Sequence, residues 1–395
     1  MTRPQNPWTT ILLCLGVMVL EGFDIQVLGV AMPRLAPELG LTPSDKGWVM
    51  GISSFGLVFG SPIGGWLADR YGRKRVLLWA VASFALATLA TSQVHGFQSL
   101  LLARFAAGLG FGAAFPNMMA IAAEVSPPGK RIFTTSAMFC GMPFGGGTSA
   151  LLTQLLPPDF DWRILFVIGG VLPLVLWPLL KAFLQETLPV HEAPPPVRMP
   201  VAKVVFGGGR AWPSLLLWLG FLPTMLVLYL ILNWLPTLVE AKGFSKIVAP
   251  QASLAFNYAS VVGALVLGAL VDRVGPRWAM SLAYVAVIAG AHALGAATQM
   301  SSVLWISGLI GFFLMGANYA LYGVAASHYP AIIRGTGSGV AVGVGRFGSV
   351  IGPLVPGLLL QAGMTANDVI FLMVPAAAVA GLAVFAVSFF APAKD

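Results

Sequence analysis

Charged side chains are scarce in this chain. Only 9% of its 395 residues are Asp, Glu, Lys or Arg, whereas 57% are hydrophobic, and the mean hydropathy is +0.86. A soluble protein carries about 25% charged residues. This deficit is too large for an unusually large core to explain, so the composition excludes a soluble globular protein and indicates an integral membrane protein.

Several functional signals are also missing. No G-x-x-x-x-G-K-[ST] loop is present, which argues against an ATP-driven pump, and no H-E-x-x-H motif is present, which argues against a membrane metalloprotease. Strand-like alternation is absent, so a membrane barrel is excluded. The two cysteines, Cys14 and Cys140, lie inside expected helices and predict two buried thiols and no structural disulfide. We therefore expect neither an enzyme nor a cofactor.

The chain consists mostly of long apolar runs. A membrane-spanning helix needs about 20 apolar residues, and charged or Pro-rich breaks divide the chain into twelve such segments. The first run is too long and too acidic for a cleavable signal peptide. The expected spans are 10–33, 47–68, 76–93, 98–123, 132–156, 163–185, 212–239, 250–271, 278–297, 302–327, 336–362 and 368–391.

The net charge of +8 is explained by the membrane topology of the chain and does not indicate a nucleic-acid partner. If the N-terminus is cytoplasmic, 15 of the 22 basic residues fall inside, five fall outside and two lie within the membrane. The positive-inside rule then places both termini in the cytoplasm. We expect a monomeric, multi-pass protein of a bacterial-type inner membrane, with the lipid bilayer as its surroundings.

The chain is organised as two halves. A Pro-rich and then Gly-rich stretch predicts a cytoplasmic linker over 186–210, between six-helix bundles at 1–185 and 211–395. "GWLADRYGRKR" (65–75) follows the second helix, and "GALVDRVGPRW" (268–278) follows the eighth, with an offset of 203 residues between Asp69 and Asp272. The same offset relates Arg131 to Arg334. Parallel six-helix halves are typical of one transporter architecture.

Glycines predict close helix packing within each half. Small residues let two membrane helices approach closely, and Pro116, Pro143 and Pro353 supply bends. The glycines concerned are Gly108, Gly110, Gly112, Gly141, Gly145, Gly348 and Gly352.

The repeated loop motif resembles the hallmark motif of the major facilitator superfamily. Further stretches resemble its aromatic acid:proton symporter branch: "EGFDIQ" in helix 1, "ARFAAGLGFGAAFPN" (103–117), "MFCGMPFGG" (138–146), "YLILNWLPTL" (229–238) and "RGTGSGVAVGVGRFGSVIGP" (334–353). Many members of that branch have Asp where this chain has Glu21. The resemblance implies an all-α fold of twelve membrane helices in two pseudo-symmetric bundles. It also implies proton-coupled uptake of an aromatic carboxylate such as 3-(3-hydroxyphenyl)propionate or a hydroxybenzoate.

Two acids interrupt the first helix. Glu21 and Asp24 are three residues apart, so they share one helix face, which must look into the bundle because an acid facing lipid is costly. Asp24 lies about 14 Å and Arg104 about 10 Å from the outer ends of their helices. We therefore expect Arg104 to pair with Asp24 or Glu21, leaving one acid to carry a coupled proton. The alternative is a static ion pair that tethers helices.

Arg346 is the second cation inside the membrane. The second half has only Glu240, Asp272, Asp368 and Asp395 as acids, all at membrane edges. A guanidinium near the midplane suits an anionic substrate because its planar fork binds a carboxylate bidentately. The alternative is a bond to backbone carbonyls opened by nearby glycines.

Aromatic and amide side chains could complete a site for a hydroxylated ring, with Tyr and Asn forming hydrogen bonds and Phe or Trp stacking. Trp234 could instead be an interfacial anchor. The candidates are Phe23, Asn117, Tyr229, Asn233, Trp234, Asn318, Tyr319 and Tyr322.

The resemblance implies a cytoplasmic gate at the repeated motif. A purely topogenic basic loop would explain the cations but not the paired aspartates and glycines. The gate residues are Gly65, Asp69, Arg70, Gly72, Arg73, Asp272 and Arg273. His328, near Arg334, could relay protons or be a structural group.

Other transport classes fit less well. Efflux of a drug or another organic compound uses the same fold in the opposite direction, but an intramembrane arginine would repel a lipophilic cation. A channel needs no duplicated gate motif. A nutrient sensor would add a signalling extension, and we expect none here.

Overall fold

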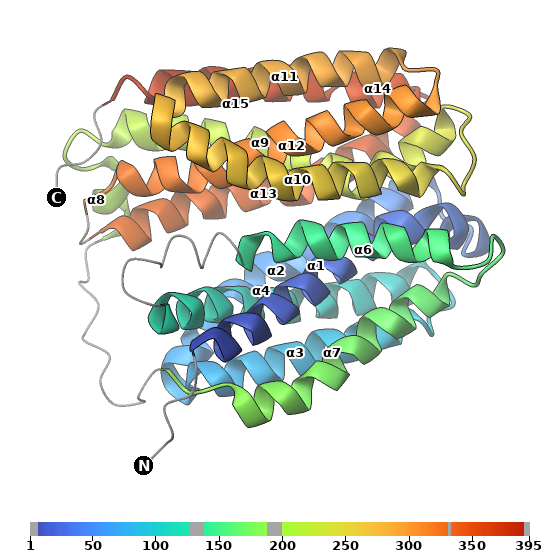
Figure 1. Ribbon diagram of the computed structural model, residues 1–395, viewed down its shortest axis with the longest axis horizontal. Helices are drawn as coiled ribbons and strands as arrows, with labels where there is room; N and C mark the ends of the chain where they lie inside the picture. Colours follow the sequence, from blue (N-terminus) through green and yellow to red (C-terminus); the bar gives the residue numbers. More distant parts are fainter. Residues whose placement is uncertain (1–6, 127–137, 188–199, 331–332, 391–395) are drawn as a thin grey trace. The chain divides into compact units, whose positions relative to one another are not determined.

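The computed structural model describes residues 7–126, 138–187, 200–330 and 333–390. These parts of the chain are helices joined by short turns (Figure 1). The helices are α1 (Pro7–Glu38), α2 (Pro43–Tyr71), α3 (Arg73–Thr91), α4 (Phe97–Val125), α6 (Gly141–Leu155), α7 (Arg163–Phe183), α8 (Val201–Phe206), α9 (Ala211–Ala241), α10 (Ala249–Val274), α11 (Pro276–Ala296), α12 (Met300–Ser327), α13 (Arg334–Gln361), α14 (Ala366–Phe371) and α15 (Met373–Val387).

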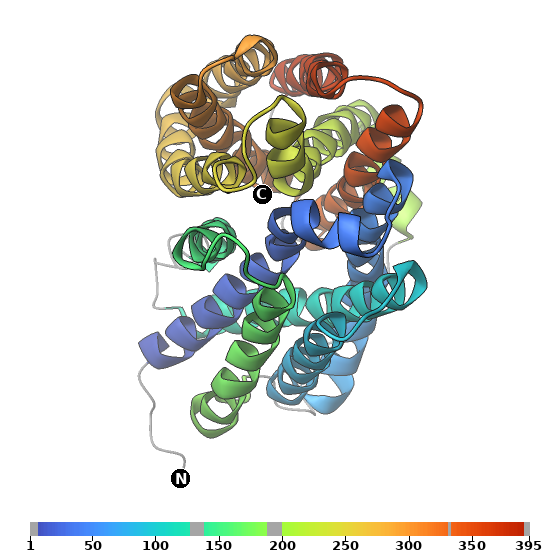
Figure 2. The same cartoon turned by 90° about the vertical axis from the view of Figure 1, so that its right-hand side faces the viewer.

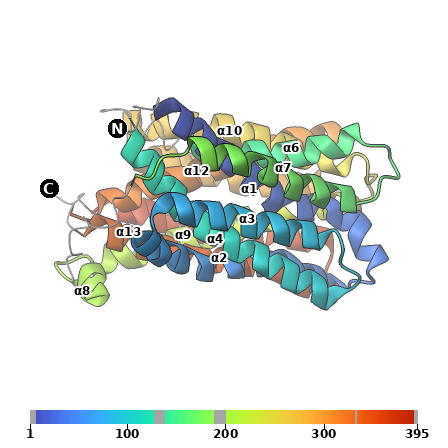
Figure 3. The same ribbon diagram turned by 90° about the horizontal axis from the view of Figure 1, so that it is seen from below.

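The chain forms two compact units, Met1–Pro194 and Pro195–Asp395. In the first unit α2 packs on α4, α3 on α4 and α7, and α1 on α6 and α7, as Figure 3 shows for α3, α4 and α7. In the second unit α10 packs on α12, α11 on α12 and α15, and α9 on α13 and α15. Each helix pair in one unit therefore has its counterpart in the other. Figure 2 shows the helices of each unit as a bundle.

Eleven helices of the described part are long and apolar enough to cross a membrane. Ten of them lie within a few residues of the expected spans. The eleventh is interrupted: the expected helix 368–391 is α14 and α15, which are separated at Leu372 but together form one span, Ala366–Val387. Of the expected helix 132–156 the structure describes α6, and its residues up to 137 lie outside the described part.

The predicted close packing at glycines is confirmed. A Cβ added to Gly145 would overlap the carbonyl oxygen of Val19, so α6 lies directly against the backbone of α1. Gly108 meets the backbone of Ser53 in the same way, and Gly348 that of Leu222. Such close contact with a neighbouring backbone requires a small residue at the point of approach.

The repeated loop motif has the same backbone shape in both units. Gly72 ends α2 with φ 90°, and Gly275 ends α10 with φ 83°. Each donates its N–H to the carbonyl four residues earlier, Ala68 or Val271, over 2.9 Å. A positive φ is costly for other residues because of the Cβ. Glycine at both positions thus turns the chain directly into the next helix.

The expected linker contains a helix that the sequence reasoning did not include. In α8, Val204 and Val205 are buried, and Ser214 of α9 donates a hydrogen bond to the Val205 carbonyl over 2.8 Å. Arg210 donates to the Val204 carbonyl over 2.9 Å. The pattern V-A-K-V-V-F packs an apolar edge on α9 and α13, so this segment belongs to the second compact unit.

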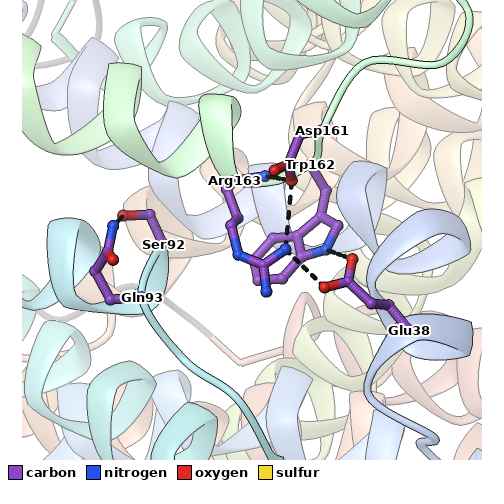
Figure 4. A network of polar contacts seen from close by, with 6 residues as sticks. All are labelled: Glu38, Ser92, Gln93, Asp161, Trp162 and Arg163. Atoms are coloured by element: carbon purple, nitrogen blue, oxygen red, sulfur yellow. Dashed lines mark hydrogen bonds and ion pairs between the residues drawn. The ribbon is translucent and has the colours of Figure 1, made fainter.

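A polar network ties the ends of α1 and α7 in the first unit (Figure 4). Glu38 accepts hydrogen bonds from the Trp162 indole over 2.7 Å and from Arg163 over 2.6 Å. Asp161 accepts from the Arg163 backbone over 2.9 Å. Because the carboxylate of Glu38 is held by both donors, the connection between α6 and α7 is fixed to the end of α1.

Candidate functional site

The first cluster centres on Asp24, which is fully buried in α1. Its Oδ2 accepts an ionic hydrogen bond from Arg104 Nη2 of α4 over 2.8 Å, and its Oδ1 accepts from the Thr88 hydroxyl of α3 over 2.6 Å. Arg104 Nη2 also reaches the Asp24 carbonyl over 3.2 Å. Both carboxylate oxygens are thus engaged, and three helices meet at one buried charge pair.

The Arg104–Asp24 pair is one of the two alternatives that the sequence leaves open. Arg104 is 0% exposed, its Nε and Nη1 lack hydrogen-bond partners within the described part, and its guanidinium carbon lies 5.9 Å from the centre of the Phe166 ring. A buried charge costs much free energy unless it is paired. Among the described residues, Nη2 is the only one of the three guanidinium nitrogens that forms hydrogen bonds.

Glu21 and Phe23 precede Asp24 on α1. Glu21 is fully buried and lies one turn before Asp24 on the same helix face. Phe23 is also buried, and its ring lies beside Gly169 of α7, where Thr88 is a neighbour as well. Three of the predicted residues of the first helix are therefore brought together inside the first unit.

The second cluster centres on Arg346, near the middle of the 28-residue helix α13. Its Nη1 donates to the hydroxyl of Tyr229 on α9 over 3.2 Å. The charge of Arg346 and the hydroxyl of Tyr229 both act electrostatically on the hydroxyl of Tyr322 on α12. Tyr322 packs edge-on against Phe221 with ring centres 5.3 Å apart. In the second unit the Arg346 cation thus interacts with two phenols, Tyr229 and Tyr322, from different helices.

The remaining candidates on α9 donate hydrogen bonds to backbone carbonyls. Asn233 is buried and donates to the carbonyl of Tyr229, one turn earlier, over 2.8 Å. Trp234 is fully buried, and its indole donates to the Pro353 carbonyl of α13 over 2.8 Å. This contact lies inside the bundle, so Trp234 is not an interfacial anchor and ties α9 to α13.

Three amide or phenol candidates lie on α12 and α4. Asn318 is 3% exposed, and its Oδ1 has no hydrogen-bond donor among the described residues. Tyr319 is half-buried beside it. Asn117 of α4 is buried and donates to the carbonyls of Ala113 over 2.7 Å and Gly64 over 3.4 Å, which links α4 to α2.

The gate residues lie at the ends of α2 and α10. Asp69 and Arg70 are exposed, as are Asp272 and Arg273 in the repeat. Within the described part, Asp69 and Asp272 form no hydrogen bond or ion pair. Gly65 lies in α2 with open space around its Cα.

Arg73 connects the gate motif to two acids that the sequence reasoning missed. Its side chain forms an ion pair with Glu124 of α4. Glu186, after α7, accepts from the backbone N–H groups of Arg73 over 2.8 Å and Lys74 over 3.2 Å. A carboxylate at a helix N-terminus accepts hydrogen bonds from free N–H groups and interacts favourably with the helix dipole. The first gate motif is therefore anchored to the chain beyond α7.

His328 is buried directly after α12. Its Nδ1 lies 2.8 Å from the carbonyl of Val324, and its Nε2 has no hydrogen-bond partner in the described part. If Nδ1 carries the proton that bonds this carbonyl, Nε2 is an acceptor. Arg334 donates to the carbonyl of Tyr329 over 3.2 Å.

Comparisons with known proteins give the family. A model of the Major Facilitator Superfamily matches residues 14–353. The chain belongs to the major facilitator superfamily. It is 38% identical over 379 residues, 95% of this chain and 93% of the relative, to the 3-(3-hydroxy-phenyl)propionate transporter of Escherichia coli (strain K12). It is 32% identical over 97% of its length to the 4-hydroxybenzoate transporter PcaK of Pseudomonas aeruginosa, of which 93% is covered.

The fold agrees with this membership. The crystal structure of a D-xylose–proton symporter superposes with a TM-score of 0.80, covering 98% of each chain at 17% identity. The predicted resemblance to the superfamily and its aromatic acid branch is confirmed, as is the all-α major facilitator fold. This superfamily member is a multi-pass membrane transporter by fold and by family.

Proposed function

We propose that this transporter takes up an aromatic carboxylate, such as 3-(3-hydroxyphenyl)propionate or a hydroxybenzoate, together with a proton. The cation of Arg346, half-buried beside Tyr229 and Tyr322 in the middle of α13, carries this proposal. A guanidinium binds a carboxylate through two parallel hydrogen bonds, and phenols offer both a ring face and a hydroxyl. The names of the two relatives, both transporters of hydroxylated aromatic acids, support the substrate class.

In this proposal the coupled proton binds to one of the acids of α1. Asp24 and Glu21 lie on one face of α1, and Arg104 already neutralises Asp24. A proton that binds to either acid changes the net charge of a buried cluster, which alters the cost of enclosing it. The likeness to a proton symporter supports a fold compatible with this coupling.

Transport then follows alternating access. The proton neutralises an acid of α1 while the substrate carboxylate neutralises Arg346, so both units lose charge before the site closes. The gate motifs around Asp69 and Asp272 would hold the cytoplasmic side until this point, and His328 would pass the proton inward. In this proposal both termini are cytoplasmic, the membrane is the bacterial inner membrane, and the protein works as a monomer that catalyses no chemical reaction.

Uptake into proteoliposomes tests the proposal. Labelled 3-(3-hydroxyphenyl)propionate should accumulate when an inward proton gradient is imposed and should not accumulate without one. Hydroxybenzoates should compete, and a sugar acid should not. An Arg346→Gln variant should lose accumulation, whereas Lys246→Gln, which removes an exposed cation of the same unit between α9 and α10, should retain it. Export of an unrelated compound without uptake of any aromatic acid would overturn the proposal.

A further inference from the structure

Asn318 of α12 carries a buried hydrogen-bond acceptor. Its side chain is 3% exposed, and no described residue donates to Oδ1. Most buried polar atoms in proteins have a partner, and an unsatisfied one costs free energy. In a carrier that encloses its cargo, such an atom finds its partner when the cargo brings a hydrogen-bond donor.

The position of Asn318 relates it to the Arg346 cluster. Asn318 and Tyr322 are four residues apart on α12, so their side chains lie on one face of the helix, about 6 Å apart along the axis. The charge of Arg346 and the hydroxyl of Tyr229 act electrostatically on the hydroxyl of Tyr322. Asn318 therefore lies about one helical turn along α12 from the phenol of Tyr322.

This spacing matches a ring with a polar group at each end. A carboxylate at Arg346 would place the aromatic ring along Tyr322 and a ring hydroxyl toward Asn318.

We infer that Asn318 determines specificity for the ring hydroxyl of the substrate, by accepting its proton in a hydrogen bond through Oδ1. This inference rests on the proposed uptake of aromatic carboxylates and narrows it to hydroxylated rings. A site built to bond a substrate hydroxyl discriminates strongly against the analogue that lacks it, since the buried acceptor is then left unpaired.

The test compares two compounds that differ only in the hydroxyl, 3-(3-hydroxyphenyl)propionate and 3-phenylpropionate. The concentration of each that halves proton-driven uptake of labelled 3-(3-hydroxyphenyl)propionate is measured in proteoliposomes. The unchanged protein should prefer the hydroxylated compound by about ten- to a hundredfold. Asn318→Leu, which is close to Asn in size, should bring this ratio near one by weakening only the hydroxylated compound.

Asn257→Leu is the matched control. Asn257 is a buried asparagine of α10, in the same unit, whose Nδ2 donates to the Ser253 carbonyl over 2.8 Å. The control should keep the ratio of the unchanged protein. If Asn318→Leu does not fold, as judged by its melting in detergent, Asn318→Ala provides the same comparison with a smaller side chain.

The possible outcomes distinguish a failure of the role of Asn318 from a failure of the proposed uptake function. A ratio that stays unchanged in the Asn318 variants, or an unchanged protein that binds both compounds equally, overturns the role of Asn318 while uptake persists. If the unchanged protein accumulates neither compound under a proton gradient, the proposed function itself fails.

Discussion

Thr88 shows how a single hydroxyl can hold a buried charge pair. The Asp24 carboxylate receives Arg104 on one oxygen and Thr88 on the other, and all three side chains are fully buried. Hydrogen bonds to a charged group are worth about 1.5–3 kcal/mol, roughly twice those between neutral groups. Thr88 therefore fixes the orientation of the carboxylate that the guanidinium meets, and it joins α3 to the α1–α4 pair.

We expect Thr88→Val to destabilise the protein, whereas Thr88→Ser should leave its stability nearly unchanged. Valine keeps the shape of threonine but leaves Asp24 Oδ1 without its donor, which should cost about 1–3 kcal/mol. Melting in detergent should show a lower Tm for the valine variant and a Tm near that of the unchanged protein for the serine variant. Proton-driven uptake should follow the same order. A serine variant that melts below the valine variant would mean that the methyl group, and not the hydroxyl, is what matters at this position.

At the scale of single residues, the sequence predicts some contacts and not others. The Arg104–Asp24 pair was one of two predicted pairs because two opposite charges at similar depths inside a membrane have few other partners. Thr88 was not predicted, since a threonine among apolar residues carries no distinctive pattern and its contact with Asp24 spans 64 positions. Glu186 was missed for the same reason, because its contact with the backbone of Arg73 spans 113 positions.

At the scale of elements, α1 and α6 are joined by backbone contact. Gly22 of α1 faces the backbone of Met142, and Gly145 of α6 faces the carbonyl of Val19. The two glycines lie on opposite sides of one interface, so the axes of the helices approach as closely as their backbones permit. This approach also determines where the face of α1 with Glu21 and Asp24 lies within the unit.

Gly145→Ala should therefore disrupt the α1–α6 contact. The added methyl group would overlap the Val19 carbonyl and force the helices apart, which should cost more than the 1–3 kcal/mol typical of overpacking a core. Gly339→Ala is the control, because this exposed glycine of α13 has open space around it, and alanine favours a helix by about 0.5–1 kcal/mol. We expect a marked loss of monodisperse protein after size-exclusion chromatography for Gly145→Ala only. Similar yields for the two variants would contradict the packing argument.

Elements were easier to predict than their ends. Long apolar runs bounded by charges define membrane helices, so the expected spans and the observed helices agree closely. The break at Leu372 and the short helix α8 were not foreseen, because each depends on packing within the second unit and not on hydrophobicity along the chain.

At the scale of the whole molecule, the two units share one packing plan but differ in their charges. The offset of 203 residues carries Asp24 to Val227 and Arg104 to Ser307, and it carries Pro143 to Arg346. Neither cluster is thus a copy of the other. In the proposed function this asymmetry divides the work, with proton binding in the first unit and anion binding in the second.

The shared loop motif offers a direct comparison between the units. Gly72 and Gly275 have nearly the same positive φ, so alanine at either position pays about 1–2 kcal/mol for its Cβ. Only at Gly72 does the added Cβ also meet Glu186, whose carboxylate accepts from the backbone of Arg73 and Lys74. At Gly275 the added Cβ has open space.

Gly72→Ala should therefore lower the Tm in detergent more than Gly275→Ala, because it displaces Glu186 and loses hydrogen bonds to a charged group, worth about 1.5–3 kcal/mol each. The excess should vanish in a Glu186→Ala background, where the carboxylate is already absent and the two glycines become equivalent. Two mutations that act on one interaction are not additive, and the cycle measures that interaction directly. If the excess persists without Glu186, the cost at Gly72 comes from its backbone alone, and the two units would differ in the strain of the turn and not in what anchors it.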